Sequence, residues 1–134
     1  MGDDQLFPLR LLYDIEWAYD EYAGNERGVY RSARGNDNVD FELRLTREPT
    51  EEERAQIKQG LIRWKNSEQQ RIDEYGWFHH MGGPDFEGTV VRWDLDTTSQ
   101  GVQHESLQAL QQRLAAIPDL EVVELVLKGV YPLE

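Results

Sequence analysis

The amino-acid sequence predicts an α+β fold: a ferredoxin-like split βαβ antiparallel sheet over about residues 39–128, with an N-terminal extension packed on it. Three observations support this prediction. Two segments alternate between apolar and polar residues, two others repeat apolar residues at helical spacing, and the order from residue 39 is strand, helix, strand, strand, helix, strand. We therefore expect a single domain, 1–134, made of an acidic, aromatic extension (1–38) and a βαββαβ core (39–134).

The N-terminal segment shows two competing patterns. Large apolar residues alternate with other residues over 9–19, which is typical of a strand. The same segment also places apolar residues at helical spacing, namely Leu12, Ile15, Tyr19 and Tyr22. Because a strand of about eleven residues is long, and because Pro8 suits the start of a helix, we predict a helix over about 9–22.

A strand follows at 39–46, where one face is apolar and consists of Val39, Phe41, Leu43 and Leu45. Residues 29–31 are expected to pair with this strand across the turn-rich segment 35–38. We expect the strand at 88–96, which has the same alternation, to lie beside 39–46 in the centre of the sheet and antiparallel to it.

The first helix is expected over about 51–73. Thr50 is a typical N-cap residue, and Glu53 completes a capping box three positions later. Ile57, Leu61 and Trp64 supply an apolar stripe. Gly60 lies inside this helix, where glycine costs about 1 kcal/mol relative to alanine.

The remaining elements follow from shorter signals. Residues 75–80 predict a short strand, and Met81–Asp85 predicts a turn because it holds Gly-Gly-Pro-Asp. A helix is expected near 104–116, ending before Pro118, and a last strand at 120–128. The apolar faces of these elements predict a shared core of Phe41, Leu43, Leu61, Trp64, Val91, Trp93, Leu110 and Leu114.

One face of the predicted sheet remains without helices. It is expected to carry mixed charges and valines, from Asp40, Glu42, Arg44, Val90, Arg92, Asp94, Val122, Glu124, Val126 and Lys128. Charges on neighbouring strands can pair, whereas the apolar valines favour burial under another part of the protein or a partner. We expect residues 1–38 to provide that cover, with a second copy of the chain in a homodimer as the alternative.

Composition limits the class of protein. The chain has 134 residues, of which 39% are hydrophobic, and it has no cysteine. This content argues against a disordered chain and against a disulfide framework. There is no apolar run of about 18 residues, as a membrane span needs, and no secretory signal pattern. A cytoplasmic location is therefore the expectation.

The net charge of −12 is the strongest global feature. Such a charge repels nucleic acid and anionic membrane surfaces, and it favours a basic protein as a partner. Solubility alone also explains it. Residues 1–26 carry seven acids and one base among large aromatic residues. We therefore predict a partner-binding set in this segment: Asp14, Glu16, Trp17, Asp20 and Glu21.

No spacing in the sequence is typical of a catalytic or metal-binding motif. The candidate metal ligands are His79, His80, Asp94, Asp96 and His104, but none of them shows a helical His-x-x-x-His spacing. Asp94 and Asp96 project to one face of a strand, as paired carboxylates for acid–base work do. We expect neither cofactor nor catalytic residue, because the chain shows no phosphate loop, dinucleotide motif or triad spacing.

Three functions remain, in order of preference. The first is a non-catalytic module that binds a basic protein, as an acidic inhibitor or immunity protein does. The second is a dimeric domain that senses a small molecule. The third is an enzyme with a His/Asp site.

Overall fold

A five-stranded sheet forms the centre of the fold in the computed structural model, which describes residues 6–19, 28–35, 38–71, 78–97 and 101–129. The strand order is β1-β8-β4-β6-β5. The bounds of these strands are Leu9–Leu12 for β1, Val122–Lys128 for β8, Asn38–Leu45 for β4, Val90–Thr97 for β6 and Phe78–Glu87 for β5.

The two central strands lie as the sequence predicts. β4 and β6 are antiparallel neighbours, with Phe41 opposite Trp93 and Leu43 opposite Val91. β8 pairs with the other side of β4, also antiparallel. The prediction that 39–46 and 88–96 lie side by side is therefore confirmed.

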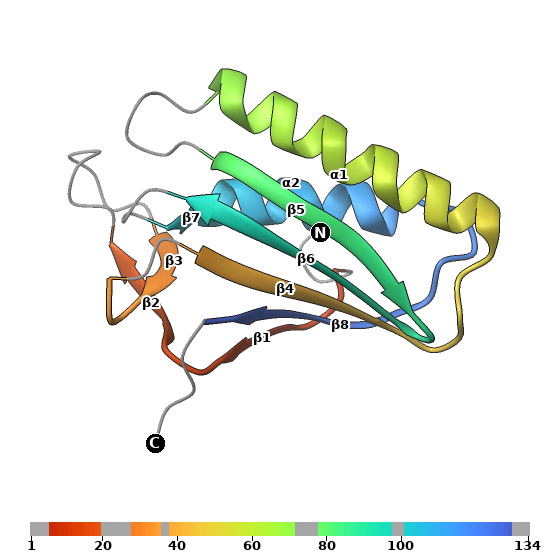
Figure 1. Ribbon diagram of the computed structural model, residues 1–134, viewed down its shortest axis with the longest axis horizontal. Helices are drawn as coiled ribbons and strands as arrows, with labels where there is room; N and C mark the ends of the chain where they lie inside the picture. The colour runs from red at the N-terminus through yellow and green to blue at the C-terminus, as the bar shows by residue number, and fades with distance from the viewer. Residues whose placement is uncertain (1–5, 20–27, 36–37, 72–77, 98–100, 130–134) are drawn as a thin grey trace.

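Two helices, α1 (Glu51–Arg71) and α2 (His104–Ala115), cover one face of this sheet (Figure 1). The predicted capping box begins α1: the Glu53 amide donates to Thr50 Oγ1 over 3.1 Å, and the Thr50 amide donates to Glu53 Oε1 over 2.9 Å. Arg47 adds hydrogen bonds of 2.7 and 2.8 Å to the Glu53 carboxylate. These contacts fix the entry of the chain into α1.

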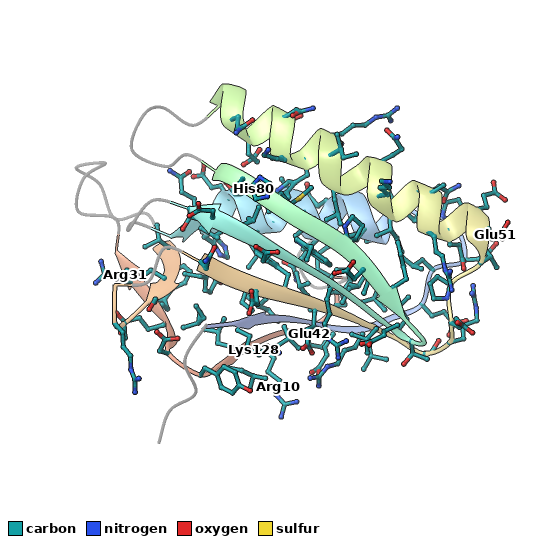
Figure 2. All side chains as sticks on the ribbon, in the orientation of Figure 1. Arg10, Arg31, Glu42, Glu51, His80 and Lys128 are labelled. Carbon is teal, nitrogen blue, oxygen red and sulfur yellow. The ribbon has the colours of Figure 1, made fainter. Side chains whose placement is uncertain are left out.

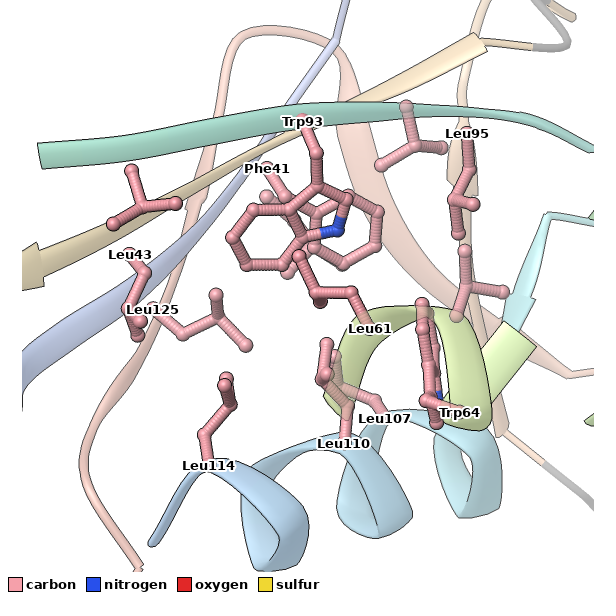
Figure 3. Packing of buried hydrophobic residues seen from close by; sticks show 14 of the residues in the cluster. Phe41, Leu43, Leu61, Trp64, Trp93, Leu95, Leu107, Leu110, Leu114 and Leu125 are labelled. Carbon is pink, nitrogen blue, oxygen red and sulfur yellow. The ribbon is translucent and has the colours of Figure 1, made fainter. Parts of the chain in front are cut away.

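The core lies between the sheet and the helices (Figure 3). Phe41 stacks on Trp93 with ring centroids 5.2 Å apart, and Trp64 meets Phe41 edge-on at 6.1 Å. The Trp64 indole nitrogen donates to the Ser106 carbonyl over 2.7 Å, which ties α1 to α2. The predicted core set is buried together, which confirms that prediction: Phe41, Leu43, Leu61, Trp64, Val91, Trp93, Leu110 and Leu114.

A second, three-stranded sheet holds β2 (Ile15–Tyr19), β3 (Gly28–Ser32) and β7 (Val102–Gln103) in the order β2-β3-β7. It lies beyond the ends of β4 and β6, at the left of Figure 1. The expected pairing of residues 29–31 with 39–46 is wrong, because β3 pairs with β2 and β7 instead. Ile15 and Tyr30 of this sheet still join the main core.

The predicted helix over 9–22 is also wrong as far as the described residues reach. The segment forms β1 and β2, with Tyr13 and Asp14 between them. Tyr13 has φ 62°, a left-handed conformation that no right-handed helix contains. Two short strands explain the alternation of residues 9–19. A single strand of that length is unusual, which is why the sequence favoured a helix.

Met81–Asp85 does not form a turn. These residues lie within β5, where the pairing register with β6 shifts between Gly82 and Asp85. Gly83 has φ 91°, and a Cβ at this position would lie 2.9 Å from the Arg92 carbonyl oxygen. The glycines therefore serve a bulge within the strand, and the chain reverses later, at Gly88 with φ 59°.

Most of the described part of the N-terminal extension does not cover the helix-free face, although the Tyr13 ring centroid lies 5.8 Å from the Lys128 ammonium nitrogen. β1 instead adds a parallel strand to the edge of β8, with Leu9 opposite Leu125 and Leu11 opposite Leu127. Leu9 and Leu11 thereby pack on the helix side of the sheet. The Gln111 side chain donates to the Phe7 carbonyl over 3.0 Å, which holds the same segment against α2.

Candidate functional site on the open face of the sheet

The open face is the side of the five-stranded sheet opposite α1 and α2, and its side chains form rows across the strands. One row, from β1 to β5, consists of Leu12, Lys128, Asp40, Asp94 and Gly82. The next row consists of Arg10, Val126, Glu42, Arg92 and Asp85. A third consists of Glu124, Arg44, Val90 and Glu87. The charges that the sequence places on this face are therefore cross-strand neighbours.

Val122 is an exception to that prediction. The pairing of β4 with β8 shifts register between Arg44 and Leu45, so that Val122 lies opposite Leu45. Val122 packs against the core, whereas Val123 is 48% exposed. The expectation that Val122 faces outward is wrong because the strand irregularity changes the alternation at this end of β8.

Glu42 is the centre of the ion pairs on the open face. Its carboxylate accepts hydrogen bonds from Lys128 at 2.7 Å, from Arg44 at 3.1 Å and from Arg92 at 3.4 Å. Its side chain is only 7% exposed, because the longer basic side chains lie over it. Figure 2 shows Glu42, Lys128 and Arg10 on three neighbouring strands.

The basic neighbours dominate the titration of Glu42. Burial alone raises the pKa of this carboxyl, but the hydrogen bonds from Lys128, Arg44 and Arg92 outweigh burial and lower the pKa to about 2. Glu124 accepts from Arg44 at 2.8 Å and pairs with Arg10 at 3.5 Å. Arg92 also pairs with Glu87, so three carboxylates engage the four basic side chains described on this face.

Asp40 and Asp94 form the opposite arrangement, because they are directly paired across β4 and β6 although both are acids. Burial raises the pKa of Asp40, Asp94 and Glu42 raise it further, and Lys128 opposes them. Directly opposed like charges destabilise a sheet. The Asp94 carboxylate also extends over Gly82, where a Cβ would lie 2.5 Å from Oδ1. The sheet thus retains a like-charge pair at a cost.

A small depression of about 210 Å³ lies over this pair. Its polar lining comes from β4, β5, β6 and β8 and consists of Asp40, Glu42, Asp85, Arg92, Asp94 and Lys128. Arg92 and Lys128 are already bound to Glu42. The depression therefore offers Asp40, Asp85 and Asp94 to a ligand, which is the chemistry that receives a cationic group.

The predicted partner-binding set does not form one surface in the described residues. Asp14 is only 2% exposed, so its expected place on an exposed face is wrong. Glu16 is exposed and pairs with Arg31 at 3.5 Å. Trp17 is 47% exposed and lies on the other face of β2, because neighbours on a strand alternate. Asp20 and Glu21 lie outside the described residues.

Trp17 is held firmly although it is exposed. Its ring meets Tyr30 edge-on at 5.0 Å and His104 edge-on at 5.2 Å. Its ring also covers Gly28, where a Cβ would collide with it. Burial raises the pKa of Tyr30, and the Tyr30 hydroxyl lies 3.2 Å from His104 Nδ1. Trp17 is therefore a preorganised aromatic surface.

The candidate metal ligands do not gather in one cluster in the described structure. His80 is exposed and lies opposite Asp96, while Asp94 belongs to the pair with Asp40. His104 begins α2 and contacts the Trp17 ring. The side chain of His79 lies outside the described part of the structure. Among the side chains that are described, no three His, Cys, Asp or Glu residues lie close enough to hold a metal ion.

Sequence reasoning placed Asp40, Glu42 and Asp94 on the open face but did not select Asp40 or Glu42 as site residues. The alternation of polar and apolar residues in β4 and β6 is the sequence feature that could have revealed this site. It places the acids of both strands on one face, and the strand register then brings them opposite one another. The register was missing, because the spacing of residues within each strand does not determine which residue lies opposite which.

Comparison with protein-family models, with curated proteins and with solved structures found no match to this chain. Within the described residues, neither α1 nor α2 has the long apolar run with which a helix crosses a membrane.

Proposed function

We propose that the chain is a non-catalytic protein-binding module for a basic protein, and that Asp40 and Asp94 receive a cationic side chain of that partner. The observation that carries the proposal is the direct opposition of these two carboxylates across β4 and β6. A bound guanidinium or ammonium group would neutralise their repulsion and would thus gain energy that is absent from the free protein.

The surroundings support a side chain rather than a large ligand. The depression measures about 210 Å³, below the range of about 300–1,000 Å³ that is common for small-molecule sites. Arginine is the favoured side chain, because its planar guanidinium group can donate two parallel hydrogen bonds to a carboxylate. The net charge of −12 would attract a basic protein over a distance and accelerate encounter at low salt.

The order of the strands and helices is consistent with this role. Strands β4, β5, β6 and β8 with α1 and α2 follow the βαββαβ order, and we assign this part to the ferredoxin-like class. Its helix-free face is the natural docking side, because the described N-terminal residues extend the sheet instead of covering it. An inhibitor or immunity protein of a basic toxin or nuclease, acting in the cytoplasm, is the specific form that we favour.

The alternative, a sensing domain that dimerises through its sheet, has less support. It requires that the valines of the open face form a contact with a second copy of the chain. Val126 has no exposed surface, and its cross-strand neighbours are Glu42 and Arg10. The face therefore presents charges, which suit a charged partner better than a second acidic copy.

A peptide titration tests the proposal. Hexa-arginine is titrated by calorimetry into the wild type and into an Asp40→Asn/Asp94→Asn double variant. The control is Glu51→Gln/Glu52→Gln, which changes the net charge equally on exposed positions of α1. We expect the Asp variant to weaken binding about tenfold or more, equal to about 1.4 kcal/mol, and the control to weaken it less than threefold.

Two results would overturn the proposal. One is equal weakening by both double variants, which would show a general electrostatic attraction without a site. The other is the absence of saturable binding to the wild type. Co-purification from the source organism then compares the same two variants, and a genuine basic partner is lost with the Asp variant alone.

A further inference from the structure

The outer surface of the helical layer contains a second hollow, a groove of about 610 Å³ between α1 and the end of α2. Its volume lies within the range that small-molecule sites occupy. The floor is largely apolar, with Ala55, Gly60, Ala116, Ile117 and Pro118. None of its lining residues lines the depression on the open face, so the two sites are separate.

Gly60 helps to form this groove at a cost to the helix. A glycine inside a helix is unfavourable, and it is usually retained where something packs closely against it. Apart from the neighbouring backbone of α1 itself, no atom of the described residues lies within 4 Å of the position that a Cβ would occupy at Gly60. Packing among the described residues therefore does not require this glycine, and the free space faces the groove.

The groove has a cationic end in a protein that is otherwise strongly acidic. Arg63 and Arg113 both line it. Arg113 donates to Ser67 Oγ over 3.1 Å, and Ser67 lies one helical turn after Arg63, so the two arginines line neighbouring parts of the groove. In the described part of the chain no carboxylate pairs with either arginine.

The opposite end has the opposite charge. Glu52 lines the groove eleven residues before Arg63, which corresponds to about 16 Å along α1. The groove is thus elongated, with two arginines toward one end, one carboxylate at the other, and a mostly apolar middle that also holds Gln56 and Gln59. A ligand with its anionic group at the arginine end avoids Glu52 and covers the apolar floor with its body.

We propose that this groove binds a small carboxylic acid with an apolar chain, the carboxylate between Arg63 and Arg113 and the chain over Gly60 and Ile117. Two guanidinium groups complement the negative charge of a carboxylate, and their planar arrangement of N–H donors matches its two oxygens. The site goes beyond the proposed protein-binding function and uses none of its residues.

Decanoate is the probe, and amide chemical shifts of the full chain are the readout. We expect saturable binding with a Kd on the order of 1 mM, as a ligand of this size in an open groove allows. Decanol and decyltrimethylammonium have the same chain without the negative charge. They should bind at least about tenfold more weakly if the arginines select the carboxylate.

Two variants test the site itself. Gly60→Leu fills the groove, and its side chain meets no protein atom at the Cβ position, so the fold is expected to persist. Arg63→Gln/Arg113→Gln removes the cationic end. Each should weaken decanoate binding about tenfold, whereas Lys58→Gln, an exposed residue of α1 outside the groove, should leave binding unchanged.

The proposal is overturned if decanoate binds no better than decanol, or if Gly60→Leu binds decanoate as the wild type does. It is also overturned if shift changes appear on β4 and β6 rather than on α1 and α2. Far-ultraviolet circular dichroism and the urea midpoint of each variant separate a lost site from a lost fold.

Discussion

A carboxylate oxygen of Asp14 occupies the space in which a side chain at position 129 would lie, so Gly129 and Asp14 fit together only because Gly129 has no Cβ. Ser32 donates to the other carboxylate oxygen, and the Ala33 amide donates to the Asp14 carbonyl over 2.8 Å. The Gly129 amide donates to the Leu12 carbonyl over 3.2 Å. This contact therefore joins the end of β8 to the connection between the two sheets.

Gly129→Ala is expected to destabilise the protein by about 1–3 kcal/mol, because the added methyl group must displace a buried carboxylate. Urea denaturation measures the change. Gly60→Ala is the matched control, since its methyl group meets open space in a helix and should stabilise by up to about 1 kcal/mol. A neutral Gly129→Ala would show that Asp14 moves away freely.

Leu110→Ala is expected to cost about 2–5 kcal/mol of unfolding free energy. Leu110 has no exposed surface and lies where α2 meets the sheet (Figure 3). Ile62→Ala removes a comparable side chain from a position that is 38% exposed, and it should cost much less. Equal costs in a urea titration would mean that the core does not form around α2.

Asp40→Asn is expected to stabilise the protein at neutral pH. Burial and then Asp94 raise the pKa of Asp40 above 3.8, so its ionised form opposes folding at pH 7. The cost disappears as the pH falls through the raised pKa and below 3.8, where the carboxyl is protonated in both states. The stability gain of Asp40→Asn should therefore shrink on acidification. A gain that persists at pH 3 would contradict this cause.

Glu42 should contribute stability that is lost in acid. Its pKa of about 2 lies below the ordinary value of 4.5, so its contribution is complete above pH 4.5 and falls as the pH approaches 2. We expect Glu42→Gln to flatten the stability profile between these values. Exposed Glu52→Gln serves as the control and should leave the slope unchanged. The measurement is a set of urea titrations from pH 2 to pH 6.

The spacing of apolar residues predicted the helices and strands correctly where that spacing is typical of only one of the two. β4, β6, α1 and α2 each have an apolar face that only one period fits, and Phe41, Trp64 and Leu110 were placed correctly. Residues 9–19 failed because a turn with positive φ at Tyr13 divides one alternation into two strands, and tyrosine gives little signal for that conformation.

The candidate site needed information that local sequence does not contain. The opposition of Asp40 and Asp94 depends on strand register, and the burial of Asp14 depends on contacts with residues more than a hundred positions away. The acidic composition of residues 1–26 predicted an exposed patch, yet composition does not distinguish an exposed acid from one bound to Ser32.

Trp17→Ala decides whether this exposed aromatic residue belongs to the core or to a surface. Trp17 is 47% exposed and contributes edge-on contacts to Tyr30 and His104, which are typically worth about 0.5–1.5 kcal/mol each. We expect the variant to remain folded, with a loss of about 1–2 kcal/mol in urea. Trp64→Ala, at a position without exposed surface, should lose about 3–5 kcal/mol. If Trp17→Ala costs as much as Trp64→Ala, the ring is structural and offers no surface to a partner. If the loss is small, its firm packing at the surface suits a contact residue, and loss of the co-purified partner with this variant would place the ring in the interface.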